Sequence, residues 1–402
     1  MFRESLRGIR VLDFTHVVAG PVCTMTLADL GADVVKVEPP AGEIGRRVGP
    51  PWLGGQSVIS LSVNRNKRSL AIDLKTPEGR RIVRRMVSRA DVLVESFRPG
   101  VMRGLGLDHD TLAVANPALV YCSISAFGQE SPARDRPGVD GVIQAVTGLM
   151  STLGHPGSGP AKVQIPVADM VTGYLASIAV LAALREVRDG KPGQHLDVSL
   201  YNATIMLQQT SFASFLTSAA EPERLGSAAP YAAPNEALPT ADGWIMVAAY
   251  DPKRWAALCR ALEAPHLTAD PRFATNADRV AHRPELRAEL SRLFARRTTR
   301  SWLEILASQD ILCAPVAGYR EVVESEEYRA SGVETTAGPV RMPGFVLGPS
   351  QPDGAPDRPA PLPGQHSAAV LAEYGLSGAE IARLADRGVI SAGPTTRTEV
   401  IA

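Results

Sequence analysis

The chain has 402 residues, more than one hydrophobic core usually supports, so its length predicts two domains. Its composition, 45% hydrophobic and 21% charged, is that of an ordinary globular protein. The 42 basic and 42 acidic side chains cancel, so no global field attracts nucleic acid or an anionic membrane. Any anionic ligand must therefore be held by a local site.

Cysteine usage and hydropathy indicate in which cellular compartment the protein is expected. The four cysteines are far apart and none sits at zinc-ligand spacing, so we expect no metal site and a reducing environment. The amino-terminal segment lacks the apolar stretch of a signal peptide, and the longest apolar run, 174–184, is too short to cross a bilayer. We therefore expect a cytoplasmic protein with neither a membrane nor a nucleic-acid partner.

From residue 9 onward, short β-branched runs alternate with helical ones, which is typical of a parallel sheet built from βαβ units. The predicted strands of this part are 9–14, 33–38, 91–97, 118–128 and 194–200. The predicted helices are 21–31 and 77–90, one helix between residues 97 and 118, one starting near Asp169 and one beginning around Tyr201. Ligands bind such sheets beyond the carboxyl ends of the strands. The candidate ligand loops are therefore 15–20, 38–50, 96–104 and 126–140. No GxGxxG follows the first strand, which argues against a dinucleotide fingerprint.

The composition changes near residue 220, where an Ala- and Pro-rich segment is typical of a linker. The elements expected after it are strand 243–250 and helices 252–262, 283–297, 298–311 and 377–388. This pattern predicts an α/β fold with a Rossmann-like large domain at 1–220 and a small α+β domain at 225–330. Residues 331–402 are expected to return to the large domain.

One carboxylate, Asp169, stands where a loop becomes a long apolar helix, in IPVADMVTGYL (165–175). Aspartate is a favoured helix cap, which is a purely structural interpretation. A helix N-terminus also keeps a carboxylate ionised, as nucleophilic catalysis requires. The two roles do not exclude each other, and both stay open at this point.

Other catalytic signatures are missing, whereas basic side chains are grouped. GxSxG and HExxH motifs are absent, which argues against common hydrolase and metalloprotease chemistry. Each basic group is either a solvated surface run or part of a phosphate site. The second interpretation has a chemical reason, because a guanidinium group can bind two phosphate oxygens at once. Their members are Arg46 and Arg47, then Arg65, Lys67 and Arg68, then Arg98 and Arg103.

Three long segments carry a family resemblance: LRGIRVLDFTHVVAGPVCTMTLADLGADVVKVEPPAGEIGRR (6–47), NRNKRSLAIDLKTPEGRRIVRRMVSRADVLVESFRPGVMRGLGL (64–107) and FGQESPARDRPGVDGVIQAVTGLMS (127–151). They resemble the class III CoA-transferases, the family of formyl-CoA, carnitine-CoA and related carboxylate CoA-transferases. The resemblance runs from about residue 5 to residue 375. It implies a Rossmann-like large domain, a smaller domain and an interlocked homodimer. It also implies acyl-CoA and a small carboxylate as substrates, with no cofactor.

The resemblance assigns roles to individual positions. Asp169 matches the nucleophilic aspartate of the family, and Asp140 matches an acidic position beside it. Arg98 and Arg103 are the implied phosphate partners, and Met102 or Leu105 would flank the adenine. The full implied CoA site is His16, Val17, Val18, Ala19, Lys36, Pro39, Arg46, Arg47, Arg98, Met102, Arg103 and Leu105, and no metal ligand is implied.

The implied reaction moves CoA from a succinyl-CoA-like donor to a small carboxylic or dicarboxylic acid through an aspartyl-CoA thioester. Two departures put a formate and oxalate pair in doubt. Val18 stands where formyl-CoA transferase-like members have glutamine, and residues 205–260 contain no clear glycine-rich lid. Gly104 stands where the common pattern has its arginine, one residue after Arg103.

Two alternatives remain. The first is an acyl-CoA racemase or isomerase acting at the α-carbon. Such members of the family use a histidine where this chain has Val139, and valine takes no proton. The second is a non-catalytic CoA-binding protein, against which the intact Asp169 counts.

Overall fold

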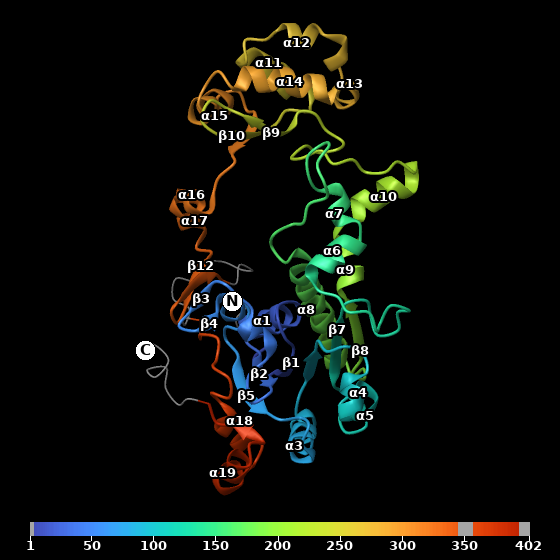
Figure 1. Ribbon diagram of the computed structural model, residues 1–402, viewed down its shortest axis with the longest axis vertical. Coiled ribbons are helices and arrows are strands. Elements are labelled where there is room, and N and C mark those ends of the chain that lie inside the picture. Colours follow the sequence, from blue (N-terminus) through green and yellow to red (C-terminus); the bar gives the residue numbers. More distant parts are fainter. Residues whose placement is uncertain (1–3, 345–356, 394–402) are drawn as a thin grey trace. The chain divides into compact units, whose positions relative to one another are not determined.

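The computed structural model describes residues 4–344 and 357–393, and these form two compact units. The larger unit comprises the residues up to 150, residues 162–220 and those from 330 on. The smaller unit comprises residues 151–161 and 221–329. The loop at 151–161 thus belongs to the smaller unit, whereas the boundaries drawn from the sequence put it in the large domain. Figure 1 shows the elements of both units.

A seven-stranded sheet with the order β14-β5-β2-β1-β6-β7-β8 forms the centre of the larger unit. Its strands are β1 (Arg10–Phe14), β2 (Asp33–Glu38), β5 (Arg68–Ile72), β6 (Val92–Glu95), β7 (Val120–Ser125), β8 (His195–Ser199) and β14 (Ile390–Ser391). All neighbours are parallel except β14, which runs antiparallel to β5. Counted along the chain, the parallel strands have the Rossmann order 3-2-1-4-5-6. The order reverses between β1 and β6, which makes their carboxyl ends the expected ligand crevice.

Helices cover both faces of this sheet, which explains its continuous apolar strands. Every residue of β6 and β7 is buried, as expected for parallel strands sandwiched between helices. One face packs against α3 (Pro77–Val87), α18 (Ser367–Glu373) and α19 (Gly378–Asp386). The other face packs against α1 (Ala19–Asp29) and α8 (Val167–Arg188). Helix α3 begins with the predicted signals, because Thr76 caps the Gly79 N–H and Pro77 is its first residue.

Strand β5 was not predicted, because its sequence begins with basic residues. Arg68, its first residue, pairs with Asp33 at 2.6 Å and with Glu373 at 2.7 Å. Just before the strand, Arg65 is buried and pairs with Asp29 at 2.5 Å. These arginines therefore join segments of the larger unit, and the phosphate interpretation of this basic group is wrong.

The shorter elements of the larger unit lie in the connections. They are η2 (Ile44–Arg47), β3 (Trp52–Leu53), β4 (Gln56–Ser57), α2 (Val58–Ser62), α4 (Val101–Leu105), α5 (His109–Ala113), α6 (Asp140–Val146), α7 (Leu149–Thr152), α9 (Leu200–Leu207), α10 (Gln209–Ser218), β12 (Glu334–Ala337) and β13 (Val340–Pro343). Two short helices, α4 and α5, replace the single helix expected between β6 and β7.

The smaller unit is an antiparallel sheet of order β11-β10-β9 covered by helices. Its elements are β9 (Asn235–Pro239), β10 (Trp244–Ala248), α11 (Pro252–Ala261), α12 (His266–Ala269), η3 (Pro271–Phe273), α13 (Asn276–Ala281), α14 (Arg283–Phe294), α15 (Thr299–Ala307), β11 (Leu312–Pro315) and α16 (Tyr319–Glu324), followed by α17 (Glu326–Ser331). Asp251 caps α11 and Thr298 caps α15 through their side chains. A separate apolar cluster around Leu258, Leu290 and Phe294 gives this unit a core of its own.

Helix α8 packs closely on α1 through small residues. A Cβ added to Gly173 would meet the Ala19 carbonyl oxygen at 2.6 Å, so only glycine permits this approach. Of the described helices, α8 is the one long and apolar enough to span a membrane by length and composition, and 39% of its apolar window is buried. Its other side exposes Tyr174 and Ile178. The helix therefore has one buried face and one uncovered apolar face.

Candidate active site

A buried carboxylate, Asp13, fixes the loop that follows β1. It accepts hydrogen bonds from the Thr15 N–H at 2.8 Å and the Thr15 hydroxyl at 2.5 Å, and it pairs with Lys67 at 3.0 Å. Burial alone would raise the pKa of Asp13, but Lys36, Lys67 and the bonds from Thr15 hold it well below its ordinary value. Lys36 is fully buried and donates to the Thr15 carbonyl at 2.8 Å. Its ammonium therefore supports the loop and is closed off from a ligand.

The first loop is tied to the loop after β6 at the reversal of strand order. The His16 N–H donates to the Ser96 hydroxyl at 3.0 Å, and the His16 ring nitrogen Nδ1 lies 3.1 Å from the same oxygen. The ring stacks obliquely near Phe97, and burial lowers the pKa of His16. The two loops expected to form the ligand crevice thus lie in direct contact.

The next residues of this loop face α8. Val17 has a φ of 65°, a left-handed conformation that is unusual for a β-branched residue, and its N–H donates to Glu43. Val18 is buried in a small apolar cluster that Val17 and Met170 also contact. Ala19 is the first residue of α1. Because Met170 follows Asp169, the first loop packs against the beginning of α8.

Asp169 is the third residue of α8, and the N-cap position is occupied by Pro166. The interpretation of Asp169 as a helix cap is therefore wrong. Its carboxylate is half-buried and makes no side-chain hydrogen bond to any residue that the structure describes. It is an uncommitted carboxylate in the first turn of a long helix.

Asp140, the first residue of α6, supplies the missing cap from another helix. Its Oδ2 accepts from the Ala168 N–H at 2.8 Å and from the Asp169 N–H at 3.4 Å. Its Oδ1 accepts from Gln144 at 2.7 Å and lies 3.6 Å from the Lys162 ammonium. Proline caps poorly, and the carboxylate of Asp140 satisfies N–H groups that Pro166 leaves open. Asp140 thereby holds the backbone that carries Asp169.

The electrostatic environment of Asp169 differs from the expectation drawn from the sequence. Burial and the nearby charge of Asp140 raise its pKa to about 7, and Lys162 opposes the rise. A helix N-terminus was expected to favour the ionised form. Burial and a like charge outweigh that effect here. The carboxyl therefore titrates near neutral pH.

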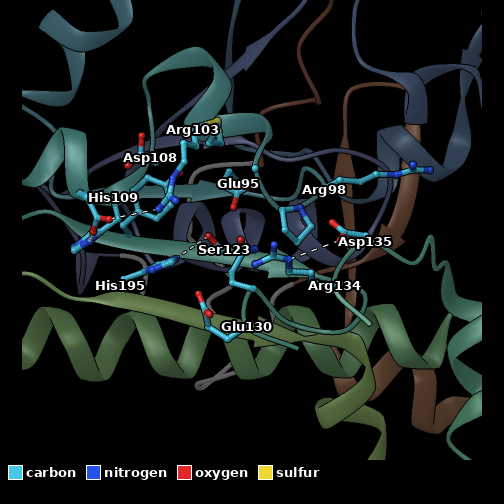
Figure 2. Close-up of a pocket in the computed structure, with 16 residues that line it drawn as sticks. Glu95, Arg98, Arg103, Asp108, His109, Ser123, Glu130, Arg134, Asp135 and His195 are labelled. Carbon is cyan, nitrogen blue, oxygen red and sulfur yellow. Dashed lines mark hydrogen bonds and ion pairs between the residues drawn. The ribbon is translucent and has the colours of Figure 1, made fainter. Parts of the chain in front are cut away.

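A cavity of about 460 Å³ opens beyond β6 and β7 in the larger unit, and Figure 2 shows the side chains around it. Of the residues predicted to bind CoA, it brings together Arg98, Met102 and Arg103. The remaining lining residues are Glu95, Pro99, Gly100, Asp108, His109, Asp110, Tyr121, Ser123, Gln129, Glu130, Arg134, Asp135 and His195. Arg98 and Arg134 are exposed, and Arg103 makes only a loose, exposed pair with Asp110 at 3.6 Å.

The inner wall of this cavity holds polar residues that the sequence did not reveal. Ser123 Oγ lies 3.0 Å from His195 Nε2, and the ring of His195 stacks on that of His109 at 5.3 Å. Burial raises the pKa of Glu95 to about 7, and burial together with His109 lowers the pKa of His195. The position of Glu95 at the end of a strand was one available signal. Ser123 and His195 meet only because β7 pairs with β8, and a lone sequence does not give that register.

The other predicted CoA residues lie elsewhere. Arg46 forms a two-pronged pair with Glu38, at 2.7 Å for both contacts, and donates to the Pro361 carbonyl at 2.9 Å. Its guanidinium is therefore already engaged. Pro39 and Arg47 are exposed, and Arg46 and Arg47 line a smaller cavity of about 170 Å³. Leu105 is partly buried against the apolar core near α3.

Comparison with known proteins gives a single family. The model of CoA-transferase family III matches residues 6–367. The chain is 37% identical to the succinate–glutarate CoA-transferase of Agrobacterium fabrum over 386 residues, which cover 92% of this chain and 96% of that protein. It is 34% identical to the human succinyl-CoA:glutarate CoA-transferase over 377 residues, covering 92% of this chain and 86% of that protein.

Solved structures agree with these matches. A CaiB/BaiF family protein from Brucella suis superposes with a TM-score of 0.83 at 35% identity, covering 92% of this chain and 99% of that one. Rv3272 from Mycobacterium tuberculosis gives a TM-score of 0.79 at 32% identity, covering 90% of this chain and 98% of that one. The chain therefore belongs to CoA-transferase family III and is an enzyme that transfers CoA.

Proposed function

We propose that the enzyme transfers CoA from a succinyl-CoA-like donor to a small dicarboxylic acid through a thioester on Asp169. The observation that carries this proposal is the state of the two neighbouring carboxylates. Asp140 is committed to backbone N–H groups, whereas Asp169 is half-buried and free of side-chain hydrogen bonds among the described residues. A carboxylate held in place by its backbone but left chemically free suits a nucleophile.

In the first half of the reaction, an Asp169 oxygen attacks the thioester carbonyl of the donor, and the C–S bond breaks. The acyl group is then held as a mixed anhydride and CoA leaves as a thiolate. The thiolate attacks the Asp169 carbonyl, which forms the aspartyl-CoA thioester and releases the donor acid. The acceptor carboxylate reverses these steps, so that CoA leaves on the acceptor and Asp169 is restored. No resident cofactor takes part in this sequence.

We place the nucleotide end of CoA in the 460 Å³ cavity. Arg98 and Arg103 are exposed guanidinium groups at this cavity, and such groups pair well with phosphates. Arg134 joins them as a cation that the sequence did not suggest. Lys36 and Arg46 are left out of this assignment, because each is engaged with protein groups.

The substrate assignment rests on the relatives. Two relatives are named for succinate or succinyl-CoA together with glutarate, and another, from Haloarcula hispanica, for succinyl-CoA and mesaconate. All of these acids are dicarboxylates. A racemase is disfavoured, because Val139 is an exposed, non-titratable side chain at the start of α6.

We further propose that the enzyme works as a homodimer whose subunits meet over the uncovered face of the helices α8 to α10. Tyr174, Ile178, Met206, Leu207 and Leu216 are exposed large apolar side chains on these helices. Large apolar side chains exposed together on neighbouring helices are typical of an interface between chains.

Intact-protein mass spectrometry tests the covalent route. Wild-type enzyme mixed with succinyl-CoA should gain a CoA-sized adduct that hydroxylamine removes, and Asp169→Ala should gain none. Asp189→Ala changes an exposed carboxylate of the same unit at the opposite end of α8 and should leave the adduct intact. An adduct that persists in Asp169→Ala contradicts the proposal. The lack of any adduct in the wild type with several acyl-CoA donors does so as well.

A further inference from the structure

Lys162 is a cation at the candidate active site that none of the assignments above uses. It lies 3.6 Å from Asp140 Oδ1, close enough for an ion pair but beyond hydrogen-bond distance. Its side chain is 46% exposed, and its ammonium donates no hydrogen bond to a residue that the structure describes. All three of its N–H donors therefore remain available to a ligand.

The position of Lys162 is fixed by its neighbours. The aliphatic stem lies over Gly141, since a Cβ added there would meet Lys162 Cδ at 3.6 Å. The Gln144 side chain makes two hydrogen bonds to the backbone of the next residue, Val163. Its Oε1 accepts from the Val163 N–H at 2.9 Å, and its Nε2 donates to the Val163 carbonyl at 3.2 Å. The same Gln144 side chain donates to Asp140. A hydrogen-bonded clamp thus holds the residue after Lys162 against the helix that carries Asp140.

Lys162 and Asp169 contact different oxygens of the same carboxylate, that of Asp140. Asp140 Oδ1 faces the Lys162 ammonium, and Asp140 Oδ2 faces the Asp169 N–H. The positive charge of Lys162 also acts on the Asp169 carboxyl, whose pKa it lowers. Both residues therefore border the same carboxylate, with Asp169 as the reacting group and Lys162 as the cation beside it.

The charges at the site make a cation necessary for this substrate class. A dicarboxylate brings two negative charges to a site that already holds Asp140 and Asp169, and like charges repel strongly in a partly buried site. The reacting carboxylate loses its charge on forming the thioester, but the distant one keeps it. Among the ion pairs of the described residues, Lys162 is the cation that contacts Asp140.

We infer that Lys162 binds the distant carboxylate of the dicarboxylic acid and so sets the preference for dicarboxylates over monocarboxylates. This inference rests on the proposed transferase function of Asp169. Lys162 is a specificity residue, because its ammonium touches the part of the substrate that does not react. The same contact serves the acyl group of succinyl-CoA in the first half-reaction.

The experiment compares two donors of equal chain length, succinyl-CoA and butyryl-CoA, in wild type, Lys162→Met and Lys162→Arg. The rate of adduct formation on Asp169 is followed by rapid quenching and mass spectrometry at about pH 9, above the titration of Asp169, so that a change in its pKa does not alter the rate with either donor. Lys162→Met should lower kcat/KM for succinyl-CoA by roughly 10- to 100-fold, the range of a lost hydrogen bond to a charge, and leave butyryl-CoA within about 2-fold. Lys162→Arg keeps the charge and should retain most of the preference. Lys191→Met, at an exposed lysine just beyond the far end of α8, is the matched control.

Three outcomes would count against the inference. If succinyl-CoA and butyryl-CoA slow equally in Lys162→Met, the residue acts on Asp169 or Asp140 and not on the substrate. If neither donor responds, Lys162 has no part in binding. If the wild type forms an adduct with neither donor, the transferase proposal itself fails and the inference falls with it. A butyryl-CoA adduct without any effect of Lys162 refutes only the inference.

Discussion

A carboxylate that titrates near neutral pH makes the first half-reaction strongly dependent on pH. Asp169 must be ionised to attack, so the rate of adduct formation should rise as pH increases through about 7 and level off above it. Butyryl-CoA is the donor of choice, because its acyl group carries no charge. The rate is measured by rapid quenching between about pH 5 and 9.

Two variants identify the group behind this rise. Asp140→Asn removes a negative charge and should move the rise to lower pH, whereas Lys162→Met removes a positive charge and should move it to higher pH. Lys191→Met should leave it in place. A rise that no variant moves would assign the titration to a group other than Asp169.

Glu95 predicts a pH dependence of stability that is separate from catalysis. Burial raises its pKa from 4.5 to about 7, so the folded state holds the proton more tightly than the unfolded state. The stability that this provides is complete below pH 4.5 and disappears as pH rises through 7. Wild type should therefore lose roughly 2–3 kcal/mol across this window relative to Glu95→Gln, which does not titrate.

Urea unfolding of both proteins at pH 5 and pH 8 checks this difference. Glu78→Gln, a change at a partly exposed carboxylate on α3 that pairs with Arg387, is the control and should show the same difference between the two pH values as the wild type. Parallel losses in wild type and Glu95→Gln would contradict the assigned pKa.

The N-terminus of α8 depends on a cap that comes from α6. Removal of that cap in Asp140→Ala leaves the N–H groups of Ala168 and Asp169 without their partner, which should cost about 1–2 kcal/mol of folding free energy. The same loss frees the backbone of the nucleophile, so kcat should fall much more than stability explains. Asp251→Ala removes the cap of α11 in the smaller unit, with a similar stability cost but no loss of activity.

Denaturation curves and steady-state rates on the two variants make this comparison. Equal loss of activity in Asp140→Ala and Asp251→Ala would show that the effect of Asp140 is one of general stability. Asp140→Asn, which keeps an acceptor oxygen, should recover most of the stability lost in Asp140→Ala.

The elements found from the sequence are those whose signals are local. Strands β1, β2, β6 and β7 were recognised because burial on both faces makes them continuously apolar, and α3 was recognised from Thr76 and Pro77. The cap of α8 was not, because its acceptor stands 29 positions earlier in the chain. The raised pKa of Asp169 could not be predicted either, because it depends on burial and on Asp140, which is distant in the sequence.

The exposed apolar face of α8 to α10 predicts the assembly state of the whole molecule. Light scattering should give twice the 42.7 kDa of one chain. Ile178→Glu places a charge in that face, at a side chain that is 61% exposed, and should shift the equilibrium toward the single chain. Val114→Glu, at an isolated residue that is 86% exposed, should not. A wild-type mass of one chain would refute the dimer.

At the scale of the molecule, composition and the alternation of elements indicated a parallel α/β unit followed by an α+β unit. They did not indicate that residues 151–161 join the smaller unit. The chain passes from the larger unit to the smaller one and back within a glycine-rich loop, where the composition marks no boundary. The 460 Å³ cavity lies at two of the expected ligand loops, 96–104 and 126–140, but its inner wall was not predicted. Its walls come from three separate segments, around Glu95, Glu130 and His195.

The edge of the central sheet beside β5 is covered by the last described part of the chain. The Ser69 carbonyl accepts from the His366 N–H, and β14 pairs with Ile72 and Ala71. Figure 1 shows the red helix α18 beside the blue strand β5. About 300 residues separate β5 from β14, so at common synthesis rates the strand waits roughly 15–60 s for its neighbour. During translation an apolar strand with unpaired N–H and carbonyl groups is therefore open to other chains. We therefore expect the nascent chain to need chaperones until residues 364–391 have been synthesised, which is long after Asp169 has left the ribosome.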